Sequence, residues 1–66
     1  MKQYTNSEIT FLIDEYIHSE RDRKVLKRRL IDKITIASLA EEFDYSVRHM
    51  QRIVSKAEKE LMKYMK

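Results

Sequence analysis

The stretch "LAEEFDYSVRHMQRIV", residues 39–54, contains two short apolar patterns that meet at Asp44-Tyr45-Ser46. The first pattern ends at Phe43. Ser46 is a favourable N-cap residue, so a new helix is predicted to begin directly after it. Asp44 stands where glycine is commonest in such a turn, and aspartate tolerates left-handed or turn geometry better than most other residues. The stretch therefore predicts two helices joined by a three-residue corner.

The whole chain has the composition of a small helical domain. Its 66 residues include no glycine, proline or cysteine, and 38% of them are charged. This length supports one domain, residues 1–66, with a thin core. The lack of cysteine excludes disulfides and thiolate zinc sites and fits a reducing cytosol, so a cytoplasmic protein is expected. The longest apolar run, residues 11–13, is too short for a signal peptide or a membrane span.

Helix starts are predicted from N-caps, because no glycine or proline marks the ends. Thr5 and Glu8 have the spacing of a capping box for a helix that runs to about residue 18. Ser19 is the N-cap expected for a helix over about 20–32, Thr35 for a short third helix, and Ser46 for a fourth that runs to about residue 64. The predicted fold class is therefore an all-α, four-helix domain. The residues predicted to face its core are Ile9, Leu12, Ile13, Tyr16, Ile17, Val25, Leu26, Leu30, Leu39, Ala40, Phe43, Val47, Met50, Ile53, Val54, Ala57, Leu61, Tyr64 and Met65.

The charges alternate from one predicted helix to the next. Residues 1–20 have one base and four acids, a net charge of −3, whereas residues 46–66 have six bases and two acids, a net charge of +4. On a helical wheel, all six bases of the fourth helix lie on one stripe opposite Met50. A solvated face usually mixes both signs, so the stripe favours a polyanionic partner. The six bases are Arg48, Arg52, Lys56, Lys59, Lys63 and Lys66, and the second helix adds Arg21, Lys24, Lys27 and Arg28 on its outer side.

A short helix, a three-residue turn and a second helix with a basic outer face form the arrangement of a helix-turn-helix, whose second helix enters the DNA major groove. The stretch "ERDRKVLKRRLIDKITIASLAEEFDYSVRHMQRIVSKAEKEL", residues 20–61, resembles region 4 of bacterial sigma-70-type factors. Small phage-related and Gram-positive regulators are built similarly. The resemblance implies double-stranded DNA binding by the helix over about 46–64.

The resemblance rests on four segments of the family pattern. These are a basic helix at residues 20–26, a brace at residues 39–43, a Ser-capped recognition helix at residues 46–52, and a tail made by Ile53, Lys56, Ala57 and Leu61. The chain departs from the family in having Val47, Arg48 and His49 after the cap and Asp44 in place of the turn glycine. It also has nothing resembling a promoter-melting region, so a complete sigma factor is not expected.

The expected function is sequence-specific DNA binding in transcription regulation. Arg48, Gln51 and Arg52 are predicted to contact base edges, since arginine suits guanine and glutamine suits adenine. Val47 and His49 are placed beside them in the first turn of the fourth helix. The residues predicted to contact phosphates are Ser46, Ser55, Lys56 and Lys59, with Lys24, Lys27 and Arg28 behind them.

No enzymatic activity, cofactor, metal, membrane or small-molecule substrate is expected. Asp14 and His18 have a spacing that can share a metal, but no third ligand accompanies them. The alternative function is a protein-interaction module that contacts RNA polymerase or another regulator through the acidic first helix. Phe11 points about 160° away from the apolar face of that helix, so a homodimer through this surface is a further candidate.

Overall fold

The computed structural model describes residues 3–65, and this part of the chain contains four α-helices and no strand. The helices are α1 (Asn6–Tyr16), α2 (Glu20–Leu26), α3 (Ile36–Phe43) and α4 (Val47–Met62). A π-helical segment, η1 (Lys27–Ile31), continues α2 without a break. The prediction of an all-α, four-helix domain is confirmed.

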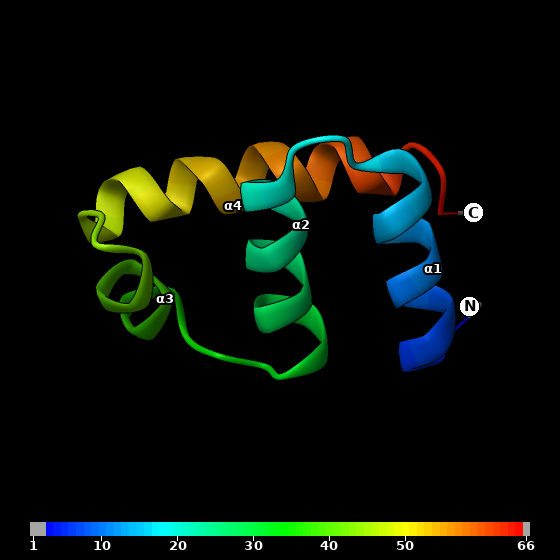
Figure 1. Cartoon of the computed structure of the whole chain (residues 1–66), viewed down its shortest axis with the longest axis horizontal. Coiled ribbons are helices and arrows are strands. Elements are labelled where there is room, and N and C mark those ends of the chain that lie inside the picture. Colours follow the sequence, from blue (N-terminus) through cyan, green and yellow to red (C-terminus); the bar gives the residue numbers. More distant parts are fainter. Residues whose placement is uncertain (1–2, 66) are drawn as a thin grey trace.

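The longest helix, α4, is the element on which the other three pack. It runs along the long axis of the molecule, while α1 and α2 lie side by side and cross it (Figure 1). The corner between α3 and α4 lies at one end of this axis, and α1 and both termini lie at the other. The acidic helix α1 is therefore far from the first turn of α4.

Each α-helix begins at the N-cap that the sequence predicts. The Thr5 hydroxyl accepts a hydrogen bond from the Glu8 amide at 3.1 Å, and the Glu8 carboxylate accepts one from the Thr5 amide at 3.0 Å, which completes the capping box. The hydroxyl oxygens of Ser19, Thr35 and Ser46 accept from the amides of Asp22, Ser38 and His49 in the same way.

The core consists of two apolar clusters that meet at α2. Val25 contributes to the cluster under α3 and the first half of α4, and its neighbour Leu26 contributes to the cluster between α1 and the second half of α4. Both side chains are fully buried, and burying a side chain of this size stabilises a fold by about 1.5–3 kcal/mol. The first cluster is Val25, Leu39, Ala40, Met50, Ile53 and Val54, and the second is Ile13, Ile17, Leu26, Ala57 and Leu61.

Two residues predicted to face the core are exposed instead. Val47 is 48% exposed because it lies in the first turn of α4, at the end of the molecule and beyond the buried residues of that helix. Tyr64 is 44% exposed because α4 ends at Met62, so the helical wheel no longer describes its position. Its ring stacks on Tyr16 with the centroids 3.9 Å apart.

The second helix differs from the regular helix predicted over residues 20–32. In η1 the Asp32 amide donates to the Lys27 carbonyl at 3.2 Å, an i→i+5 bond whose ring contains one more residue than the i→i+4 ring of an α-helix. The chain then leaves through Lys33, whose φ is 58°. None of the helices in residues 3–65 combines the length and the apolar character that crossing a membrane requires.

Candidate nucleic-acid interface

The corner between α3 and α4 fixes the direction in which α4 starts. Asp44, directly after α3, has φ 60° and ψ 44°, the left-handed conformation for which the sequence suggested aspartate as a substitute for glycine. Only Asp44, Tyr45 and Ser46 separate the two helices. The Ser46 hydroxyl then accepts the His49 amide at 3.1 Å, so the first turn of α4 is capped.

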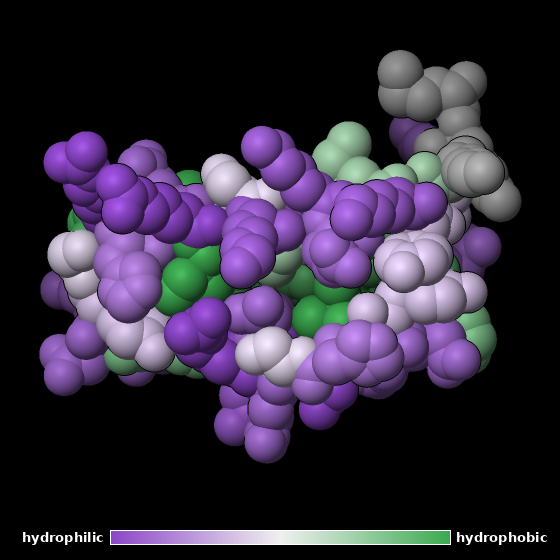
Figure 2. Space-filling view, turned by 90° about the horizontal axis from the view of Figure 1, so that it is seen from above, coloured by the Kyte–Doolittle hydropathy of each residue, from purple (hydrophilic) through white to green (hydrophobic). Residues whose placement is uncertain are grey.

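The outer face of α4 carries a basic stripe, here defined as Arg48, Arg52, Lys56 and Lys59. All four side chains are exposed, and none forms an ion pair with another residue in the range 3–65. The predicted stripe is shorter in practice, since Lys63 lies beyond the end of α4 and pairs with Glu60 at 3.4 Å, and Lys66 lies outside the described residues. Seen from above (Figure 2), the molecule shows mainly hydrophilic side chains, with apolar surface visible between them.

The residues predicted to read base edges lie together. Arg48, Gln51, Arg52 and Ser55 line one open depression on the outer face of α4. An arginine guanidinium donates in a planar fork, and a glutamine amide both donates and accepts, so this surface offers the hydrogen-bonding groups that base edges require.

The side chains at the start of α4 have different roles: Ser46 caps the helix, and those that follow are exposed. The Ser46 hydroxyl is already used as the N-cap acceptor, and the exposed Val47 offers only apolar contact. The His49 ring lies against the Tyr45 ring, with centroids 4.6 Å apart and a 57° angle between the planes. His49 is thus exposed but held against the corner.

The three bases of the second helix that are predicted to contact phosphates each lie within ion-pair distance of a carboxylate. Lys24 lies 4.0 Å from Glu20, and the Lys27 ammonium lies 2.7 Å from the carboxylate of Asp14 on α1. Arg28 pairs with Asp32 and with Glu42 of α3 at 3.0 and 2.8 Å. Lys24, Lys27 and Arg28 line a different hollow, together with Glu42 and Phe43. Lys27 and Arg28 are therefore less available to phosphates than their charge suggests, whereas the exposed Lys24 is held only weakly.

Two arginines have raised pKa values for identifiable reasons. The hydrogen bond of Arg28 to Glu42, followed by that to Asp32, raises its pKa above the ordinary arginine value. For Arg21, the hydrogen bond with the Tyr45 side chain is the largest cause of a raised pKa. Arg21 was not among the predicted site residues, and its position beside the corner could not be predicted because it depends on how α2 crosses α4.

Other polar groups have structural partners. The Arg23 guanidinium donates to the Ile17 carbonyl at 3.0 Å, so it holds the end of α1. Asp14 is paired with Lys27, and within residues 3–65 no three metal-ligating side chains gather into a group.

Comparison of the chain with models of protein families, with curated proteins and with solved structures finds no match in any of the three. The assignment of a function therefore depends on the residues and the geometry described above.

Proposed function

We propose that this chain binds double-stranded DNA in a sequence-specific way and regulates transcription, with α3 and α4 as a helix-turn-helix and α4 as the recognition helix. One observation carries the proposal: four exposed bases without acidic partners among the described residues project from α4, which begins at a corner fixed by left-handed Asp44. A helix presented in this way fits the major groove, which is about 12 Å wide. The resemblance of residues 20–61 to region 4 of sigma-70-type factors supports the same function.

The roles follow from position along α4. Arg48, Gln51 and Arg52 lie in its first two turns, which are the turns that reach base edges in helix-turn-helix proteins. Lys56 and Lys59 lie further along and are assigned to phosphates, together with the Ser55 hydroxyl. Lys24 and Lys27 would contribute only if they exchanged their carboxylate partners for phosphates.

A salt titration tests this function. If the four bases of the stripe each neutralise one phosphate, the logarithm of the binding constant should fall against the logarithm of salt concentration with a slope of roughly −3 to −4 per protomer. The duplex would be selected from a random pool with the protein itself. Lys59→Ala should make the slope shallower by about 0.9, whereas the matched variant Lys63→Ala, whose base pairs with Glu60, should change it less. Absence of binding at low salt, or a flat dependence, would overturn the proposal.

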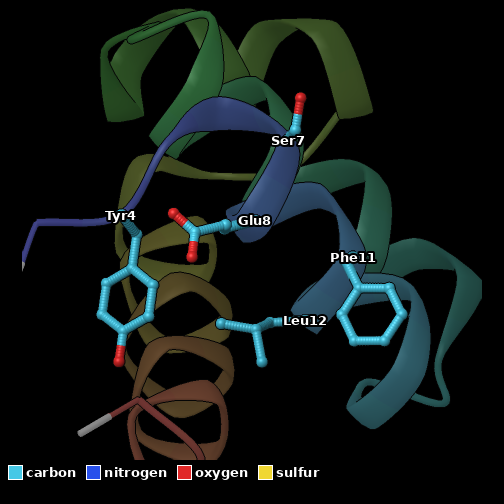
Figure 3. A pocket seen from close by; sticks show the side chains of 5 residues that line it. All are labelled: Tyr4, Ser7, Glu8, Phe11 and Leu12. Carbon is cyan, nitrogen blue, oxygen red and sulfur yellow. The ribbon is translucent and has the colours of Figure 1, made fainter.

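A second candidate function is the contact with RNA polymerase or another regulator through α1. Phe11 is 63% exposed, and together with Tyr4, Ser7, Glu8 and Leu12 it lines a hollow. In Figure 3 the rings of Tyr4 and Phe11 lie on opposite sides of Leu12. Since α1 contains three acids and no base, this surface suits a partner with apolar and basic side chains. If Phe11→Ser abolishes regulation but still binds DNA, this second function is favoured. If Lys56→Ala and Lys59→Ala abolish both DNA binding and regulation while Phe11→Ser changes neither, the first function is favoured.

A further inference from the structure

The contact between Arg28 and Glu42 differs in geometry from the other ion pairs of the described chain. The Arg28 Nε donates to one carboxylate oxygen of Glu42 at 3.0 Å, and Nη2 donates to the other at 2.8 Å. The remaining nitrogen, Nη1, donates to Asp32 at 3.0 Å. All three guanidinium nitrogens are therefore used, in the two-pronged arrangement that makes an exposed ion pair effective when single contacts are not.

The backbone at Arg28 is tied down as well. The Arg28 carbonyl accepts a hydrogen bond from the Ile34 amide at 3.1 Å, and the Arg29 side chain donates to the Ile34 carbonyl at 3.0 Å. The π-helical turn and the connection that follows it are thus joined by two hydrogen bonds. Because the Arg28 backbone is held in place, its side chain can fix the position of α3 relative to α2.

The helix that receives this contact needs such support. α3 is eight residues long and packs mainly on α4, with a smaller contact to η1. Val25 of α2 already packs with Leu39 and Ala40 of α3 in one apolar cluster, so the hydrogen bonds to η1 add a directional attachment to packing that is not directional. Glu42 is the residue of α3 through which the attachment to η1 is made by hydrogen bonds.

We infer that Arg28 is a positioning residue. Through its two-pronged contact with Glu42, here called the clamp, it fixes the angle of the α3–α4 corner relative to α2, and it does not contact DNA phosphate itself. The inference rests on the proposed DNA-binding function and revises the phosphate role predicted for Arg28. The Glu42 carboxylate is part of the same device, because its two oxygens accept both hydrogen bonds of the two-pronged contact. The negative charge of Glu42 is therefore needed to hold the corner.

Variants of both partners separate positioning from phosphate contact. Arg28→Lys keeps the charge but cannot form the fork, and Glu42→Gln keeps the shape but removes the charge. If the correct angle is then populated only about 10–30% of the time, affinity for the selected duplex falls about 3- to 10-fold, while affinity for random duplex changes little. The salt slope stays at the wild-type value. The double variant binds the selected duplex no more weakly than the more affected single variant, because both changes remove the same contact.

A phosphate contact gives the opposite set of results. Glu42→Gln would then release Arg28 and tighten binding, Arg28→Lys would be close to wild type, and Arg28→Ala would make the salt slope shallower by about 0.9. This outcome would overturn the inference. Glu41→Gln is the matched control, because it removes the same charge from the neighbouring position of α3, where the carboxylate forms no ion pair with the described residues. It should leave the ratio of selected to random affinity unchanged.

A measurement without DNA separates failure of this inference from failure of the proposed function. Residual dipolar couplings of backbone amides in α2, α3 and α4 should fit one common orientation in the wild type. In Arg28→Lys and Glu42→Gln, well below their unfolding midpoints, the couplings of α3 should shrink relative to those of α2, and in Glu41→Gln they should not. If the wild type does not bind duplex DNA but the couplings change as stated, the clamp stands and the DNA function falls. Unchanged couplings in both variants would overturn the clamp whatever the protein binds.

Discussion

The backbone amide of Tyr45 donates a hydrogen bond to the carbonyl oxygen of Ala40 at 2.8 Å, across the end of α3. The amide of Asp44 donates to the Glu41 carbonyl at 3.2 Å, and Asp44 lies between them in the left-handed conformation. This pair of bonds is the Schellman motif, which normally ends on glycine. Tyr45 also packs against the apolar cluster that contains Ala40, as this motif commonly requires. The corner is therefore closed by its backbone, with aspartate occupying a position that suits glycine.

Asp44→Gly should stabilise the protein. Glycine adopts φ 60° without the steric cost that a Cβ imposes, although it also gains freedom in the unfolded chain. We expect a net gain of about 0.5–1 kcal/mol, which corresponds to a rise of roughly 2–8 °C in the unfolding midpoint of a domain this small. Thermal unfolding followed by circular dichroism measures it.

A β-branched residue at the same position provides the contrast. Asp44→Val should lower the midpoint, because valine is a genuine outlier at positive φ. If the glycine and valine variants were destabilised to the same extent, the Asp44 side chain would be making a contribution that its exposed position does not explain.

Ser46→Ala should destabilise α4 without touching any charge. The Ser46 hydroxyl accepts the His49 amide at 3.1 Å, and loss of such a cap costs about 0.5–2 kcal/mol. Urea unfolding at fixed pH gives the free energy directly. An unchanged free energy of unfolding would show that water replaces the cap without cost.

Ser46→Asp distinguishes capping from DNA contact at the same position. Aspartate caps a helix as well as serine does and interacts favourably with the helix N-terminus, so stability should be kept. The added negative charge lies at the turn proposed to face the major groove, so DNA affinity should fall about 10-fold or more. Electrophoretic mobility shifts on the selected duplex measure this change. Undiminished affinity in this variant would place the start of α4 away from DNA.

Arg48→Ala and Lys59→Ala should reduce DNA binding in different ways. Arg48 lies in the first turn of α4, and its loss should cost about 1–3 kcal/mol on the selected duplex and little on random DNA. Lys59 lies three turns further along and should weaken both duplexes about equally. Competition binding with the two duplexes gives both numbers. Uniform losses from both variants would mean that Arg48 reads no base.

The local features of this fold were predictable from sequence, and the interactions between helices were not. The N-caps at Thr5, Ser19, Thr35 and Ser46 involve residues only three positions apart, so their spacing is sufficient to locate them. The buried positions of α4 follow from helical periodicity in the same way. The π-helical turn at Lys27–Ile31 was missed, because the spacing of apolar residues does not report a change to i→i+5 hydrogen bonding.

The charged residues show the same limit at the candidate site. A helical wheel places Lys27 and Arg28 on an outer face, but it cannot show that Asp14 and Glu42, from two other helices, lie within 2.7 and 2.8 Å of them. These distances depend on the angles at which α1 and α3 pack. The stripe on α4 was predictable because it requires the periodicity of a single helix, whereas the clamp at Arg28 required the structure.

Phe11 leads to the last prediction, which concerns assembly. Its side chain is 63% exposed on α1, although a domain with so small a core gains by burying every large apolar group. Scattered exposed apolar residues are normal on protein surfaces, so exposure alone does not define an interface. Phe11, however, is joined by Leu12 and Tyr4 around one hollow (Figure 3). The helix that carries Phe11 and Leu12, α1, lies at the opposite end of the molecule from the corner between α3 and α4 (Figure 1).

A two-fold dimer through α1 would leave the α3–α4 corner of both copies uncovered, because α1 and this corner lie at opposite ends of the molecule (Figure 1). Covering two copies of Phe11 should contribute about 3 kcal/mol, so Phe11→Ser should raise the dissociation constant of the dimer about 100-fold. Met62→Ser, which changes an equally exposed apolar residue on α4, is the matched control and should leave self-association unchanged. Sedimentation equilibrium across micromolar concentrations measures the mass of each variant.

Salt should act on this dimer and on DNA binding in opposite directions. Two copies of α1 bring together acidic residues such as Glu15, which is exposed and has no ion-pair partner among residues 3–65, so added salt screens their repulsion and should strengthen the dimer. DNA binding should weaken over the same range. A wild type that stays monomeric at every salt concentration, with and without duplex DNA, would exclude a second copy as the partner of Phe11 and leave a different protein with basic and apolar side chains as the partner of α1.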